Sequence, residues 1–152
     1  MWIRVLLAFA VVLVASSREA AACMCVGSAE PKSDAQITRE VKDELGKAVG
    51  VFTGRVVERD ELTVTFEVDA VWKGEIGPTH IMSTGAVASP DGTISMTSCD
   101  FSFARGRSYL VFAFGKSLVE AKATSCTRTS EMRYALETLP VLDKLAERRR
   151  PR

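Results

Sequence analysis

Two cysteines that stand one residue apart, Cys23 and Cys25, constrain this chain more than any other feature of its sequence. The other two cysteines, Cys99 and Cys126, lie far along the chain. A bond between Cys23 and Cys25 would close a very small, strained ring, so each is expected to bond to one of the distant cysteines. Two such pairings remain open. Either one ties the N-terminal Cys-x-Cys segment to two remote parts of the fold.

Residues 1–22 have the pattern of a secretory signal peptide. Arg4 supplies a positive charge, and an unbroken apolar run of eleven residues covers Val5–Ala15. That run is short for a membrane span, and three alanines separate it from Cys23 after a polar stretch. We expect cleavage after Ala22, which makes Cys23 the first residue of the mature protein. The alternatives are an uncleaved anchor and a lipidated Cys23, and lipidation would leave an odd number of cysteines.

Export would carry the chain into an oxidising compartment, either extracellular or periplasmic, where four cysteines predict two disulfides. Residues 23–147 are expected to form one domain, followed by a basic, solvated tail at 148–152. Without residues 1–22, basic and acidic residues balance at 18 each. This balance gives no reason to expect nucleic acid or, once the signal is cleaved, a membrane as partner, and we expect a monomer.

The hydrophobic periodicity predicts a mainly β fold with a helix at each end. The first helix is expected at 34–47, capped by Ser33 or Asp34, and the second from about residue 130, kinked or divided at Pro140. Strands are predicted at 49–58, with a bulge at Gly54, and at 62–72, 80–84, 93–97, 108–114 and 118–125. Short antiparallel strands at hairpin spacing favour a small closed or partly closed barrel, which removes exposed sheet edges.

Enzyme chemistry has little support in the sequence. The single histidine, His80, falls in a predicted strand, the cysteines are assigned to disulfides, and the paired carboxylates fall on turns or solvated helix faces. A Cys-x-Cys spacing is shorter than zinc sites ordinarily use. We therefore expect neither catalysis nor a cofactor.

Several segments, taken in order, resemble the tissue inhibitors of metalloproteinases and the wider netrin-like module. They are the Cys-Met-Cys-Val opening at 23–26, FEVDAVWKG at 66–74, GRSYLV at 106–111 and Thr-Ser-Cys at 124–126. The resemblance covers nearly the whole mature chain, but only the N-terminal domain of the animal inhibitors. One of that domain's three disulfides is missing, and Gly27 stands where a proline is common.

The resemblance implies a five-stranded closed barrel of the oligonucleotide/oligosaccharide-binding type with flanking helices. It also implies one of the two open pairings, Cys23 with Cys99 and Cys25 with Cys126. In the family the mature N-terminus is the reactive group. By that analogy, the α-amine and carbonyl of Cys23 would chelate the catalytic zinc of a target protease.

The remaining site residues follow from the same resemblance. Met24 would enter the specificity pocket of the protease, and Cys25 and Val26 would run along its cleft. Thr97 and Ser98, next to Cys99, would form a second edge beside the N-terminus. We expect a secreted, non-enzymatic inhibitor of a zinc metalloproteinase. The alternative is a netrin-like module that binds a protein or glycan through its barrel face and inhibits no protease.

Overall fold

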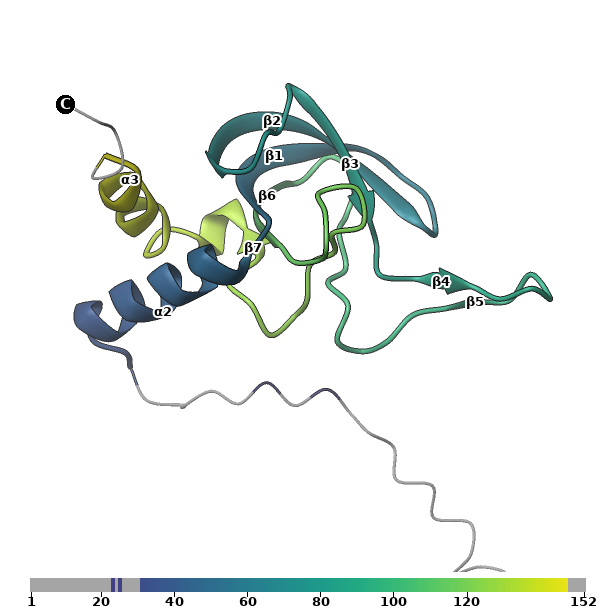
Figure 1. Cartoon of the computed structure of the whole chain (residues 1–152), viewed down its shortest axis with the longest axis horizontal. Coiled ribbons are helices and arrows are strands. Elements are labelled where there is room, and N and C mark those ends of the chain that lie inside the picture. Colours follow the sequence, from purple (N-terminus) through teal and green to yellow (C-terminus); the bar gives the residue numbers. More distant parts are fainter. Residues whose placement is uncertain (1–22, 24, 26–30, 148–152) are drawn as a thin grey trace, which may run out of the picture.

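The computed structural model describes Cys23, Cys25 and residues 31–147, and its fold is mainly β with helices near both ends (Figure 1). Residues 1–22, the proposed signal, and the tail at 148–152 lie outside the described residues. The elements are α2 (Asp34–Lys47), β1 (Gly50–Arg59), β2 (Thr63–Lys73), β3 (Thr79–Ser83), β4 (Val87–Ala88), β5 (Ile94–Ser95), β6 (Ser108–Ala113), β7 (Ser130–Glu131), the 3-10 turn η1 (Met132–Tyr134) and α3 (Leu139–Glu147).

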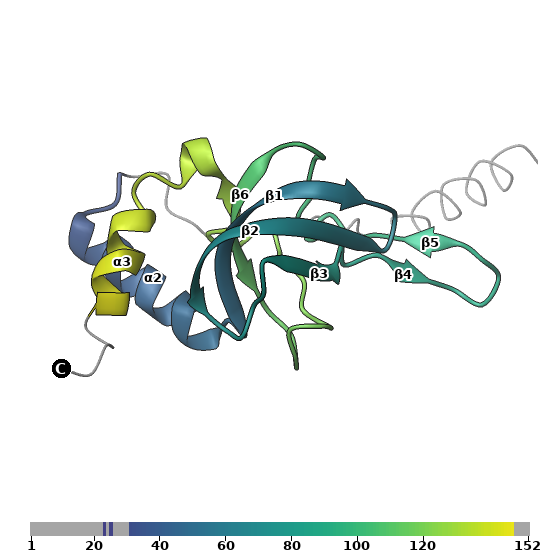
Figure 2. The same ribbon diagram turned by 90° about the horizontal axis from the view of Figure 1, so that it is seen from above.

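Five strands form one antiparallel sheet in the order β3-β2-β1-β6-β7. The two short strands β4 and β5 form a separate hairpin that projects from the body of the molecule (Figures 1 and 2). The register of β1 against β2 shifts at the predicted bulge, between Thr53 and Gly54. A side chain at Gly54 would begin 2.7 Å from the carbonyl oxygen of Glu67, so only glycine allows the two strands this approach.

The sheet carries a hydrophobic core on each face. On one face the core is enclosed by the curved sheet and contains mainly Phe52, Val56, Val64, Phe66, Met82, Phe103, Tyr109 and Val111. The other face is covered at one end by α2 and α3 (Figure 2), with a core built chiefly from Ile37, Val41, Leu45, Val51, Leu110, Phe112 and Leu142. Strand β6 is buried almost throughout because its side chains alternate between the two cores.

The predicted closed barrel is not found among the strand pairings of the described residues, since β3 and β7 form the two ends of the strand order. Near the β3 end, a loop carries hydrogen bonds that strands would otherwise make. Ser83 N donates to Ala121 O at 3.1 Å, and Phe114 and Lys122 exchange two backbone bonds at 2.9 and 3.0 Å. The segment around Ala121 and Lys122 thus touches both β3 and the end of β6.

Helix α2 has the predicted bounds, and its start is determined locally. The Ser33 hydroxyl accepts from Gln36 N while the Gln36 side chain accepts from Ser33 N, which satisfies two backbone donors in the first turn. The apolar stripe of Ile37, Val41 and Leu45 is buried against the sheet. Helix formation here follows from the cap and the stripe together.

Two predictions about the C-terminal half are wrong. Residues 118–125 form no strand; they make two isolated bridges, Phe114 with Lys122 and Asp100 with Thr124, and single backbone hydrogen bonds to neighbouring segments. The helix expected from residue 130 begins instead at Leu139, after β7 and η1. Pro140 occupies the first turn of α3, where the missing N–H costs nothing, so it starts the helix rather than kinking it.

No helix of the described ranges is long and apolar enough to cross a membrane.

Candidate functional site at the disulfide-linked N-terminal segment

Two disulfides attach the N-terminal Cys-x-Cys segment to the body of the fold. Cys23 is bonded to Cys99 and Cys25 to Cys126, with Cα–Cα distances of 5.2 and 5.0 Å. This is the pairing that the family resemblance implied. The two bonds lie side by side, because Cys23 Sγ is 3.6 Å from Cys126 Sγ. Disulfides of this kind fit a protein of an oxidising compartment.

The loops that receive the two cysteines are themselves joined by hydrogen bonds. Ser125 N donates to Cys99 O at 2.8 Å, and Phe101 N donates to Ala123 O at 3.1 Å. The bridge between Asp100 and Thr124 lies between these contacts. The N-terminal segment is therefore fixed to one connected support rather than to two independent loops.

The backbone nitrogen of Cys23 lies 3.2 Å from the hydroxyl oxygen of Ser98, to which it donates. The structure thus brings predicted site residue Ser98 to Cys23. Thr97 has a different environment, because both its backbone N–H and its hydroxyl donate to Asp100 Oδ2, at 2.9 and 2.8 Å. The predicted site residues Met24 and Val26 lie outside the described residues.

Asp100 holds the turn that carries Ser98 and Cys99. Its side chain is 0 % exposed, and Lys122 Nζ lies 2.8 Å from its second oxygen, Oδ1. Burial raises the pKa of this carboxyl, but the hydrogen bonds from Lys122 and Thr97 outweigh burial and leave the pKa below its ordinary value. Gly85 makes room for it, because a Cβ there would lie 2.4 Å from Asp100 Oδ1. Asp100 is therefore ionised and fully paired beneath the site at neutral pH.

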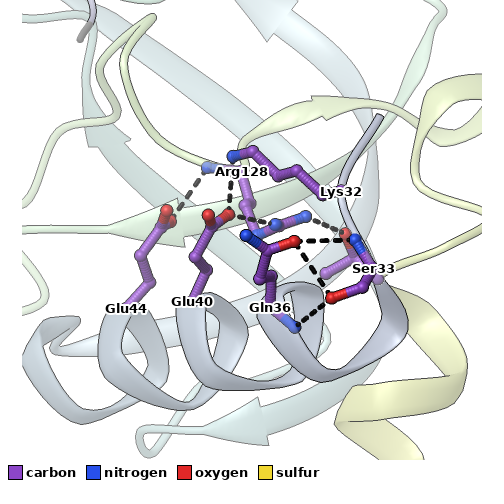
Figure 3. A network of polar contacts seen from close by, with 7 residues as sticks. Lys32, Ser33, Gln36, Glu40, Glu44 and Arg128 are labelled. Carbon is purple, nitrogen blue, oxygen red and sulfur yellow. Dashed lines mark hydrogen bonds and ion pairs between the residues drawn. The ribbon is translucent and has the colours of Figure 1, made fainter. Parts of the chain in front are cut away.

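A second polar network holds the Cys126 loop to helix α2 (Figure 3). Arg128 donates through its guanidinium to Glu40 at 2.5 Å and to the Thr138 hydroxyl at 3.3 Å. Its backbone N–H donates to Glu44 Oε2 at 2.9 Å, and Lys32 pairs with Glu40 at 2.8 Å. Glu40 and Glu44, both on α2, thus accept hydrogen bonds from Arg128, which lies two positions after Cys126.

The two carboxylates of this network titrate differently. The hydrogen bond from Lys32, together with Arg128, lowers the pKa of Glu40. Burial raises the pKa of Glu44, and the backbone donor at Arg128 offsets only part of that effect. Glu40 is accordingly the carboxylate that carries the ion pair as pH falls.

Other candidate chemistry is not assembled in the described part of the chain. There, the one group of three or more metal-ligand side chains is Cys23, Cys25 and Cys126, and all three are in disulfides. His80 stacks edge-on against Phe52 with ring centroids 5.3 Å apart, and burial lowers its pKa. Trp72 packs beside the helices and donates to Asp143 at 2.9 Å, which is a structural contact.

Sequence reasoning missed Asp100, Lys122 and Arg128, which hold the site in place. Asp100 directly follows Cys99, and Arg128 closely follows Cys126, so a charge beside each anchoring cysteine was the available signal. Their partners are far away in sequence: Glu40 is 88 residues from Arg128. No local pattern predicts such a contact.

Comparison with known proteins finds no family model and no curated protein that matches the chain. Its fold and site define it as a small, mainly β protein with a five-stranded sheet, in which two adjacent disulfides attach a Cys-x-Cys segment to the loops at Cys99 and Cys126.

Proposed function

We propose that the chain is a secreted inhibitor of zinc metalloproteinases that acts through its mature N-terminus, Cys23. The observation that carries the proposal is the double attachment of the Cys-x-Cys segment, with Cys23 N held beside Ser98 on a hydrogen-bonded support. The resemblance to the tissue inhibitors of metalloproteinases supports the same role. Cleavage after Ala22 is part of the proposal, because the inhibitor needs a free α-amine at Cys23.

The proposed chemistry is chelation of a metal that belongs to the target. The α-amine nitrogen and carbonyl oxygen of one residue form a five-membered ring with a divalent ion. Catalytic zinc keeps one coordination position open for the attacking water, and a chelating N-terminus would displace that water. The amine binds only when unprotonated, and α-amino groups ordinarily have pKa values of about 7.7–8.0, so inhibition should weaken as pH falls below that range.

Rigidity gives this terminus an advantage over a free peptide. Ordering a flexible segment costs roughly 0.5–1.5 kcal/mol for each immobilised side chain, and a segment already held by disulfides avoids much of that cost. Each disulfide closes a long loop, so the chain-entropy model assigns it roughly 4–5 kcal/mol of stability. The same two bonds would stabilise the fold and preorganise the inhibitory edge.

We also propose that the sheet is an oligonucleotide/oligosaccharide-binding-type barrel closed through the loop around Ala121 and Lys122. The backbone bonds from this loop to Ser83 and Phe114 support closure, as does the enclosed aromatic core. A closed barrel would give the disulfide-bearing loops a stiff base. Slow amide hydrogen exchange at Ser83, Phe114 and Lys122 is the expected sign of closure, and rapid exchange at all three would contradict it.

The decisive test compares the protein that starts at Cys23 with a variant carrying one extra alanine before Cys23. The oxidised proteins are titrated against a panel of zinc peptidases. Because the extra residue moves the amine away from the metal while leaving both disulfides intact, we expect the inhibition constant to rise at least about a hundredfold, or about 2.7 kcal/mol. Chemical acetylation of the amine should have the same effect.

A serine peptidase serves as the specificity control, since it has no zinc to chelate. Matching thermal unfolding of the two proteins would show that the extra alanine leaves the fold intact. Equal inhibition by both proteins would contradict chelation. A lack of inhibition by either would favour the alternative, a binding module that contacts a protein or glycan through its barrel face.

A further inference from the structure

Strand β3 forms one edge of the five-stranded sheet, and part of that edge lacks a partner. Antiparallel strands alternate between hydrogen-bonded and non-hydrogen-bonded residue pairs. Thr84 N donates to Leu62 O at 2.9 Å, and Val68 N donates to Pro78 O at 2.8 Å, which fixes the alternation at both ends of the ladder. Thr79 and Ile81 therefore stand in non-hydrogen-bonded pairs, with their backbone N–H and C=O groups directed away from β2.

The direction of these groups agrees with that of their neighbour Ser83. Ser83 has the same parity in the strand, and its N–H leaves the sheet to reach Ala121 O. Within the part of the chain that the structure describes, Thr79 and Ile81 have no such partner. Their four backbone groups form an open site for one more strand.

Apolar side chains surround this open edge. Ile81, Val87 and Val119 are 56 %, 62 % and 81 % exposed, and Leu62 is 38 % exposed. Together they line a groove of about 660 Å³ between β3, the base of the β4–β5 hairpin and the loop at Val119. No charged residue lines this groove. Exposed edges in monomeric proteins are commonly protected by lysine, proline or a bulge, and Thr79 to Ser83 contains none of these.

The sequence around the edge is also unusually poor in charge. From Ile76 to Cys99 the one charged side chain is Asp91, in the turn of the projecting hairpin, whereas a quarter of the whole chain is charged. Depletion of charge is a mark of the centre of protein interfaces. Two copies of such a surface can face each other without opposing like charges.

We infer that β3 pairs with β3 of a second copy of this chain across a two-fold axis, through Thr79 and Ile81, the part of its edge that the loop at Ala121 leaves open. Antiparallel pairing of a strand with itself is self-complementary, so one patch serves both copies, as in an isologous dimer. Each copy would cover the other's open backbone groups and bring its exposed Ile81 against the apolar groove. This interface is separate from the proposed zinc-binding terminus and does not depend on it.

Sedimentation velocity of the oxidised protein over a range of micromolar concentrations tests the inference, with hydrogen exchange as a second measurement. The mass should approach twice that of the monomer as concentration rises. The amides of Thr79 and Ile81 should exchange at least tenfold more slowly at the concentrations where the protein is dimeric than at those where it is monomeric. Ile81→Lys should remain monomeric, because it places a charge at the centre of the interface. Val71→Lys, at an exposed valine elsewhere on the sheet, is the matched control and should still dimerise.

A monomer mass at every concentration would overturn the inference and agree with the expectation drawn from the sequence. A doubled mass without slower exchange at Thr79 and Ile81 would also overturn it, because association would then use another surface. If Ile81→Lys dimerised over the same concentration range as the wild type, the inference would also be overturned.

Discussion

A buried carboxylate, that of Asp100, directly follows the cysteine that receives Cys23. Its two oxygens accept three hydrogen bonds, one from Lys122 and two from Thr97, and these bonds shape the turn that presents Ser98 to Cys23 N. Buried charges that lose a partner are costly, so this residue links the stability of the fold to the geometry of the site.

Asp100→Asn should lower the free energy of unfolding at neutral pH by about 1–3 kcal/mol, because the neutral amide forms no ion pair with Lys122 and has one acceptor oxygen for donors that now use two. The pKa of Asp100 is lowered in the folded protein, so its ionised form stabilises the fold. That contribution is complete above the ordinary pKa of 3.8 and is lost as pH falls through the folded value. Urea unfolding at about pH 7 and about pH 3 should therefore show a difference between wild type and variant that shrinks in acid. An equal difference at both pH values would contradict this account.

Helix α2 contributes to the site through Glu40 and Glu44, whose carboxylates accept hydrogen bonds from Arg128 in the Cys126 loop. Arg128 is largely buried, with 16 % of its side chain exposed, and joins that loop to Glu40 and Thr138. An exposed ion pair on the same helix, Lys47 with Asp43, provides a matched comparison because solvent surrounds both of its partners.

Arg128→Met should lower the free energy of unfolding by about 1–3 kcal/mol, since Glu40 and Thr138 lose a buried donor. Lys47→Met should change the free energy of unfolding by less than about 0.5 kcal/mol, as is usual for exposed pairs. Chemical denaturation measures both values. If the two variants lost equal stability, the loop would not depend on α2 in the way proposed here.

The elements that local sequence determines were predicted well. Helix α2 was predicted with its bounds because its cap and apolar stripe lie within the helix, and the bulge at Gly54 had a single-residue signal. The segment 118–125 was predicted wrongly as a strand that follows 108–114 as its neighbour. Its actual contacts are isolated bridges to Phe114 and Asp100 and single backbone hydrogen bonds to other segments, which arise only in the folded chain. Pro140 was interpreted as a break because proline ends some helices and begins others, and only tertiary packing decides between these roles.

At the scale of the whole molecule, the sequence predicted a mainly β fold and two disulfides that tie Cys23 and Cys25 to the distant cysteines. The choice between two disulfide pairings came from the family resemblance, because spacing alone left both open. The support beneath the site could not be predicted, since Lys122 reaches Asp100 and Arg128 reaches Glu40 only after the chain has folded. Those contacts turn two cysteine-bearing loops into one connected support.

The most direct measurement is the visible absorption spectrum of a zinc peptidase whose zinc has been replaced by cobalt, titrated with the oxidised protein that starts at Cys23. Cobalt reports its ligands through this spectrum, and entry of an amine nitrogen and a carbonyl oxygen changes both ligand type and geometry. We predict a spectral change that is complete at one equivalent, parallels the loss of activity, and is absent with the acetylated protein. Loss of activity with an unchanged cobalt spectrum, or no loss of activity at all, would contradict the proposed role of Cys23.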